Sequence, residues 1–179
     1  MKIIIILVVI GVLAAGYLVL KDKKIVEEKL NLTSLAFGHL GNIPVKYTCD
    51  GVKVNPPLEI SGVSSEARSL VLIMEDPDVP KNLRPDGMWD HWLKFNLPPT
   101  LASIEEGQDP GSLSGINTSK NLNYAPPCPP NREHRYFFYL YSLNTMLDLK
   151  EGATKAELKA AMQGHILQET VLVGLYERR

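Results

Sequence analysis

The apolar run at residues 70–74 is the clearest pattern within the body of the chain. A strand with one face in water alternates apolar and polar residues, so an unbroken run predicts a strand that is covered on both faces. An acidic turn that contains Asp76, Pro77, Asp78 and Pro80 follows it. A proline cannot donate to a sheet ladder and restricts the residue before it, so the two aspartates are expected on a stiff loop at a strand end.

Further short runs of strand-forming residues are separated by glycine, proline, asparagine and aspartate. The runs cover residues 35–37, 45–47, 58–60, 69–75, 89–97, 136–143 and 170–176. The chain also contains 13 glycines and 13 prolines, most of them between these runs. This pattern predicts a mostly β fold with two antiparallel sheets, arranged as a sandwich or Greek key.

One helix is signalled by a capping box. Thr154 at its start is followed three residues later by Glu157, and each side chain is able to satisfy a backbone N–H of the other. Leu158 and Met162 lie one helical turn apart, and Gly164 is a typical helix end. We therefore expect one or two short helices that cover part of the sandwich.

Residues 3–20 form an unbroken apolar run of 18 residues, flanked by lysines. Such a run is long enough to cross a bilayer as a hydrophobic helix. It is also consistent with a secretory signal that is cleaved after the small residues at 14–16. We therefore divide the chain into an anchor or signal (1–24), a spacer (25–34) and a folded domain (35–179). The domain is expected outside the cytoplasm, anchored to the membrane or, after cleavage, secreted.

The overall charge does not suggest a nucleic-acid partner. The formal net charge is -1 and the isoelectric point is about 6.4, and no stripe of lysine and arginine is present. Cys49 and Cys128 are far apart and do not have the spacing of a metal site. In an exported domain they are expected either to form a disulfide or to be two buried thiols.

Polar residues occur where the predicted strands begin or end. Asp76 and Asp78 follow one strand, His91 is near the start of the next, and His134 and Tyr136 share one face of a later strand. If these ends meet, they form a small pocket with imidazole, phenol and carboxylate groups. Such a pocket is suited to an anion such as a phosphomonoester, or to a metal ion held by two histidines and a carboxylate. The competing interpretation is a packed histidine beside a simple turn.

An ordered set of motifs resembles the phosphatidylethanolamine-binding protein family, in particular its bacterial and archaeal branch, sometimes called Raf-kinase-inhibitor-like. The motifs are Tyr47-Thr48-Cys49-Asp50-Gly51, Pro56-Pro57-Leu58, Asp76-Pro77-Asp78-Val79-Pro80, Trp89-Asp90-His91-Trp92, Pro126-Pro127-Cys128-Pro129-Pro130, His134-Arg135-Tyr136 and Gly164-His165-Ile166-Leu167. The resemblance covers about residues 35–179, and it implies a β-sandwich with an anion pocket at one end.

The resemblance also implies roles for individual residues. The ligand-binding residues would be Asp76, His91, His134 and Tyr136. The pocket wall would contain Asp78, Pro80, Cys128 and Pro129, with Asp78 bracing its loop.

Several positions are exceptions or are expected to lie outside the site. Pro126 and Arg132 stand where relatives usually have glycine, so the loop over the pocket is expected to differ in shape. His39 and His165 are expected not to bind the ligand. The segment 81–88 is expected to form a lip beside the pocket.

The resemblance implies a binding protein without an enzymatic activity or cofactor. Its expected ligand is a small phosphorylated or otherwise anionic molecule, such as a phospholipid head group. The membrane would be a second partner, contacted through the N-terminal helix. Two alternatives remain: a module that inhibits a protease or kinase, or a hydrolase that uses His91 and His134 directly or through a metal ion. No familiar hydrolase or nucleotide-binding fingerprint is present in the sequence.

Overall fold

A computed structural model describes residues 29–178 of the chain. Within this range the strands form one three-stranded and one six-stranded sheet. The smaller sheet has the order β1-β3-β6, with β1 at Asn31–Thr33, β3 at Leu58–Ser61 and β6 at Ser103–Ile104. The larger has the order β2-β9-β8-β4-β5-β7, with β2 at Gly41–Asn42, β9 at Ile166–Tyr176, β8 at His134–Leu143, β4 at Ser69–Asp76, β5 at Trp89–Leu97 and β7 at Leu113–Ser114. The prediction of a mostly β fold with two sheets is confirmed.

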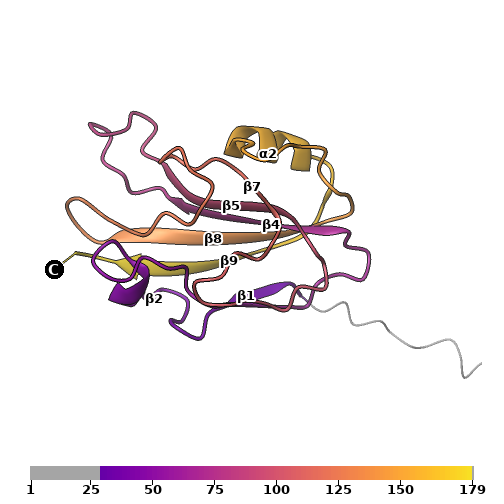
Figure 1. The fold of residues 1–179 in the computed structure, drawn as a ribbon, viewed down its shortest axis with the longest axis horizontal. Coiled ribbons are helices and arrows are strands. Elements are labelled where there is room, and N and C mark those ends of the chain that lie inside the picture. Colours follow the sequence, from indigo (N-terminus) through magenta and orange to yellow (C-terminus); the bar gives the residue numbers. More distant parts are fainter. Residues whose placement is uncertain (1–28, 179) are drawn as a thin grey trace, which may run out of the picture.

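The six-stranded sheet is covered on both faces (Figure 1). On one face it packs against the β1 sheet, and on the other against helix α2 (Lys155–Met162) and the adjoining loop. Strand β4 is buried along its whole length, as predicted. Its Leu70, Leu72 and Met74 belong to the core between the sheets, while Val71 and Ile73 belong to the core beneath α2. Two separate cores therefore explain the unbroken apolar run.

The predicted capping box at the start of α2 is confirmed. The Thr154 hydroxyl accepts from the Glu157 backbone N–H, and the Glu157 carboxylate accepts from the Thr154 backbone N–H at 2.7 Å. Leu158 and Met162 are buried against the sheet, so the helix covers one core as expected.

Two of the predicted strand runs are wrong. Residues 35 and 36 form a bend and residue 37 belongs to no strand, because the Ser34 hydroxyl accepts from the Ala36 N–H and offers the backbone a local alternative to a ladder. Residues 45–47 form a 3-10 turn, labelled η1 (Val45–Tyr47), which begins directly after Pro44.

Strand boundaries and one strand direction also differ from the predictions. Strand β1 lies inside the range assigned to the spacer, because Leu32 is buried and its strand pairs with β3. The two-residue strand β2 pairs with β9 in parallel, so the larger sheet is not purely antiparallel.

The predicted N-terminal hydrophobic helix lies outside the described residues, as do residues 25–28 of the spacer. Among residues 29–178, no helix has the length and apolar character needed to span a bilayer.

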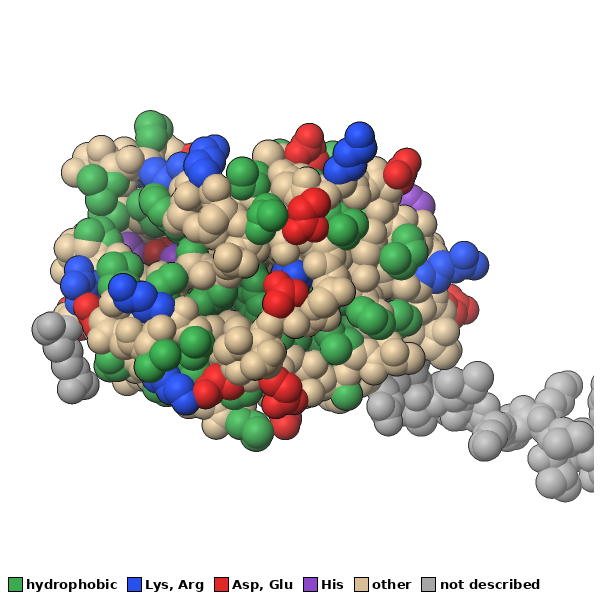
Figure 2. Space-filling view, viewed as in Figure 1, with side chains coloured by type: hydrophobic (Ala, Val, Ile, Leu, Met, Phe, Trp, Pro, Cys, Tyr) green, Lys and Arg blue, Asp and Glu red, His purple; other side chains and the backbone are tan. Residues whose placement is uncertain are grey.

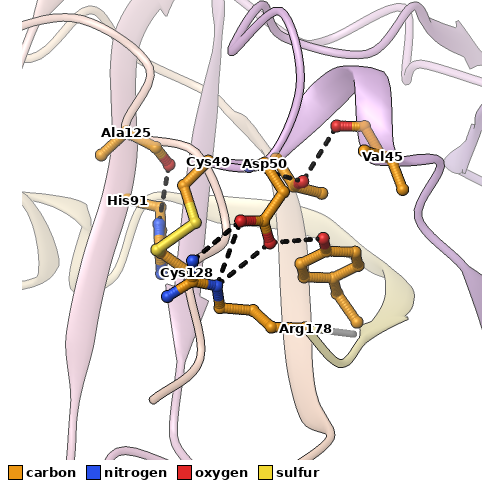
Figure 3. The surroundings of a disulfide bond; sticks show 9 residues. Val45, Cys49, Asp50, His91, Ala125, Cys128 and Arg178 are labelled. Atoms are coloured by element: carbon orange, nitrogen blue, oxygen red, sulfur yellow. Dashed lines mark hydrogen bonds and ion pairs between the residues drawn. A yellow bond between two sulfur atoms is a disulfide. The ribbon is translucent and has the colours of Figure 1, made fainter.

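Cys49 and Cys128 are joined by a disulfide across 79 residues of sequence (Figure 3). The link is reinforced because the Cys49 N–H donates to the Pro127 carbonyl at 3.0 Å. Next to Cys49, the Asp50 carboxylate accepts from Arg178 and from the Tyr176 hydroxyl. The turn after η1, the proline-rich loop and the end of the chain are thus held together at one end of the sandwich.

Removing this disulfide should lower the stability of the protein markedly. In the simple chain-entropy model, a crosslink that closes a loop of this length stabilises the fold by about 4 kcal/mol. The double variant Cys49→Ala/Cys128→Ala, measured by equilibrium denaturant unfolding, should show a loss of this order. A thiol reductant should destabilise the parent and leave the variant unchanged; equal sensitivity of the two would contradict the prediction.

Gly51 should not tolerate a side chain, because the turn that carries Cys49 leaves no room for one. A Cβ atom at Gly51 would lie 2.1 Å from the carbonyl oxygen of Val45. Gly51→Ala should therefore lower the free energy of unfolding by about 1–3 kcal/mol. The matched control is Gly38→Ala, where no atom lies within 4 Å of the added Cβ. Similar unfolding free energies for the two variants would show that the turn relaxes at little cost.

Candidate functional site

A cavity of about 320 Å³ opens where β4 ends and β5 and β8 begin. It is lined by Cys49, Asp76, Val79, Leu83, Trp89, His91, Ser119, Ala125, Pro126, Cys128, Pro130 and His134. Figure 2 shows histidine and acidic atoms together in a hollow that hydrophobic side chains surround. The cavity thus combines a polar floor with apolar walls, which is the usual composition of a small-molecule site.

His91 lies at a β-bulge in the pairing of β4 with β5. Met74 pairs with Trp92 and Glu75 pairs with Asp90, so His91 is the extra residue without a partner across the ladder. Bulges bend the strand and re-aim side chains, and they are common beside functional sites. Here the bulged residue is His91 itself, and its imidazole lines the floor of the cavity.

The ring of His91 is held by a backbone carbonyl. Its Nδ1 lies 2.7 Å from the carbonyl oxygen of Ala125, which can only accept, so Nδ1 carries the proton (Figure 3). The other nitrogen, Nε2, is buried and has no hydrogen-bond partner among the described residues. Burial lowers the pKa of His91 to about 4, outweighing the opposite effects of the Ala125 bond and of nearby Asp76. His91 is therefore neutral near pH 7 and presents a lone pair at Nε2.

His134 and Asp76 form a buried pair. His134 Nδ1 lies 2.7 Å from Asp76 Oδ2, and Nε2 lies 3.1 Å from the Asn131 side-chain oxygen. The second oxygen of Asp76 accepts from the Asp78 N–H at 2.8 Å. Both ring nitrogens of His134 and both carboxylate oxygens of Asp76 therefore have hydrogen-bond partners. The orientation of the His134 ring is fixed from both sides.

Tyr136 lies below the cavity and does not line it. Its ring packs edge-on against His91 with centroids 5.3 Å apart, and its side chain is fully buried. Its hydroxyl has no hydrogen-bond partner among the described residues. Burial, and secondarily the charge of Asp76, raises the pKa of this phenol, so it remains a protonated donor.

Asp78 braces its loop from outside the cavity. Its carboxylate accepts from Arg135 Nε at 2.8 Å and Nη2 at 2.9 Å, and these bonds lower its pKa to about 2. Arg132 is 3.5 Å from the same carboxylate and does not line the cavity. Arg132 therefore contributes to the outer surface of the loop.

The remaining predicted wall residues are only partly brought together. Cys128 lines the cavity, whereas Pro80 and Pro129 do not. Pro126 lines it, and Leu83 of the predicted lip also reaches it.

Sequence reasoning missed several contributors to the site. Asn131 and the Ala125 carbonyl lie in a loop without a periodic pattern of apolar residues. Every residue has a backbone carbonyl, so the residue type does not reveal which one accepts a hydrogen bond. Val79 and Trp89 lie in the same motifs as Asp76 and His91, which were recognised for their polar residues. Their closeness in sequence to those two residues was the signal that could have identified them as lining residues.

Other ionisable groups lie apart from this cavity. A larger hollow of about 590 Å³ contains Asp50, but that carboxylate is already bonded to Arg178 and Tyr176. His39 Nδ1 accepts from the Val173 N–H, and His165 Nδ1 contacts Asn144. Among residues 29–178, no group of three or more His, Cys, Asp and Glu side chains is placed to hold a metal ion. The smaller cavity is the candidate site because, of the hollows described, it alone is lined by a residue with a buried polar atom that has no partner, His91 Nε2.

Acid should destabilise the protein through His91. In the unfolded chain a histidine takes up its proton near pH 6.5, whereas folded His91 does so only near pH 4. Protons therefore favour the unfolded state, and the contribution of His91 to stability, present above pH 6.5, is lost as the pH falls toward 4. Between pH 7 and 4.5 this loss should be about 2 kcal/mol.

Denaturant unfolding of the parent and of His91→Asn at both pH values measures this contribution. Asparagine is able to replace the Nδ1 donor but does not titrate, so the variant should lose less stability than the parent. His165→Asn changes an exposed histidine and should behave as the parent does. A His91→Asn variant that is as acid-sensitive as the parent would show that His91 is not the cause.

Comparison with known proteins identifies the chain's relatives. The family model described as phosphatidylethanolamine-binding protein matches residues 33–177. A "UPF0098 protein" of Chlamydia muridarum is 50% identical over 83% of this chain and 99% of its own length. One of Methanothermobacter thermautotrophicus is 48% identical over the same shares.

Solved structures agree with this assignment. A putative phosphatidylethanolamine-binding protein homolog from Chlamydia trachomatis superposes with a TM-score of 0.83 at 47% identity, covering 85% of this chain and 99% of that one. YbcL of E. coli, described as a new member of the mammalian family, reaches 0.75 at 20% identity over 84% and 99%, and so shares the fold. The chain therefore belongs to the phosphatidylethanolamine-binding protein family.

Proposed function

We propose that this protein binds a small ligand with a phosphate-like anionic group, without converting it. The observation that carries the proposal is His91 Nε2, a buried polar atom of a cavity-lining residue that has no partner among the described residues. Leaving such an atom unpaired costs about 1–3 kcal/mol, so a ligand that bonds it gains that energy. Family membership supports the same assignment.

The cavity is suited to a compact head group with an apolar attachment. Val79, Leu83 and Trp89 line it on the β4–β5 side and Pro126 on the opposite loop. A tetrahedral group on the polar floor would place its substituent against these walls. A phospholipid head group is one ligand of this class.

The absence of turnover is part of the proposal. His134 is the natural base for a hydrolytic mechanism, but both of its ring nitrogens are engaged, by Asp76 and Asn131. A general base must reach the proton that it removes, and His134 would first have to release Asn131. We assign it the role of orienting Asp76.

We further propose that the domain functions outside the cytoplasm. The disulfide supports this placement, because such bonds persist chiefly in oxidising compartments. The apolar run at residues 3–20 supplies the means of export or anchoring.

His91→Ala and His134→Ala should each weaken the binding of phosphoethanolamine by about 1–3 kcal/mol, the range for hydrogen bonds that involve a charged group. His91 is placed to contact the ligand directly, and His134 holds the adjacent Asp76. Isothermal titration calorimetry of the parent and both variants measures the loss, with His165→Ala as the control that should bind as the parent does. Equal affinity in all four proteins would remove the assignment of the site.

A further inference from the structure

The cavity is unusual for an anion site because its lining contains no lysine or arginine among the described residues. Arg132 and Arg135 are paired with Asp78 on the outside of the loop. Arg84 lies over the ring of the lining residue Trp89 and is paired with Asp86. The lining does contain a carboxylate, Asp76. A fully ionised dianion would therefore meet the Asp76 carboxylate in a lining that offers no lysine or arginine to offset it.

The polar floor is also short of free donors. The Nδ1 proton of His91 is committed to the Ala125 carbonyl, which leaves Nε2 as an acceptor. His134 is bonded at both nitrogens. The Tyr136 hydroxyl is unpaired but does not line the cavity, so among residues 29–178 the unpaired side-chain donors of the lining are the Trp89 indole N–H and the Ser119 hydroxyl.

Burial keeps His91 neutral, although nearby Asp76 favours its charged form. Asp76 on β4 and His134 and Tyr136 on β8 are the titratable side chains near it. The loop that covers its other side contributes Ala125 and Pro126, which carry no charge. His91 is only 4% exposed, so a proton placed on it would be largely removed from water.

We propose that this pocket binds its ligand in the protonated form, as a phosphate monoester monoanion whose P–OH group donates to Nε2 of His91. This inference rests on the proposed function and names the form of the ligand. The protonated ligand carries one negative charge fewer beside the Asp76 carboxylate. His91 thereby distinguishes tetrahedral anions that carry an O–H from those that do not.

The proton comes from solvent whenever the free ligand is a dianion. A phosphomonoester has its second pKa near 6, so above that pH each binding event takes up one proton. The apparent affinity should then fall about tenfold for each pH unit above the ligand's pKa.

Methyl phosphate and methyl sulfate form the test pair. Near pH 5.5 both are mainly monoanions of similar shape, and only methyl phosphate carries an O–H. For the parent protein, the Kd of methyl phosphate should fall about tenfold from pH 8 to pH 7, with uptake of nearly one proton when calorimetry is repeated in buffers of different ionisation enthalpy. Methyl sulfate should bind at least about tenfold more weakly than methyl phosphate at pH 5.5, which corresponds to one hydrogen bond.

The His91→Asn variant tests the role of Nε2, which is proposed to contact the ligand, separately from that of Nδ1, which bonds the Ala125 carbonyl. Asparagine retains a donor for the Ala125 carbonyl and lacks Nε2, so its preference for methyl phosphate should fall to about threefold or less. His165→Asn, which alters a histidine bonded to Asn144 away from the cavity, should keep the parent preference.

The outcomes separate this inference from the proposed function. If neither probe binds at any pH, the proposed function fails and this inference fails with it. If methyl phosphate binds with no proton uptake, or if methyl sulfate binds equally well at pH 5.5, the anion pocket stands and the protonated-ligand inference is overturned. If the affinities of both probes rise together as the pH falls, the proton resides on His91, which also contradicts the inference.

Discussion

The burial of β4 on both faces is the constraint on which the rest of the structure depends. Its apolar run needs two apolar layers, and the chain supplies them as the β1 sheet on one side and α2 on the other. A strand fixed in this way ends at a defined point, so Asp76 at its end has a fixed position. The partner strands β5 and β8 pair directly with β4, and this pairing brings His91 and His134 to the same end of the sheet.

The hydrogen bond from His91 to the Ala125 carbonyl then sets the chemistry of the site. It fixes which ring nitrogen carries the proton and leaves the other, Nε2, as an unpartnered acceptor among the described residues. Ala125 precedes Pro126, and a residue before proline is restricted to extended conformations, so this loop is stiff where it meets the ring. The disulfide and the bond from Cys49 to Pro127 tie the same loop to the turn after η1. The position of Pro126, which appeared as a departure from the usual glycine, is thus consistent with a loop built to hold one imidazole.

Charge in the loop region is directed away from the pocket. Arg135 and Arg132 interact with Asp78 on the outer surface, and Asp78 is held as a carboxylate by these contacts. The cavity itself contains an acidic and two imidazole side chains. No lysine or arginine of the described residues therefore lines the cavity, and the proposed anionic ligand would meet the Asp76 carboxylate there.

The sequence by itself determined the elements whose signal is local. The buried strand followed from five consecutive apolar residues, α2 from its capping box, and the site from polar residues at strand ends and an ordered set of motifs. Only the tertiary structure decided the features that depend on residues far apart in the chain. The bulge at His91 arises from register with β4, the accepting carbonyl comes from residue 125, and the disulfide spans 79 residues. The tautomer of His91 and the burial of Tyr136 are set by these long-range contacts, and no local pattern encodes them.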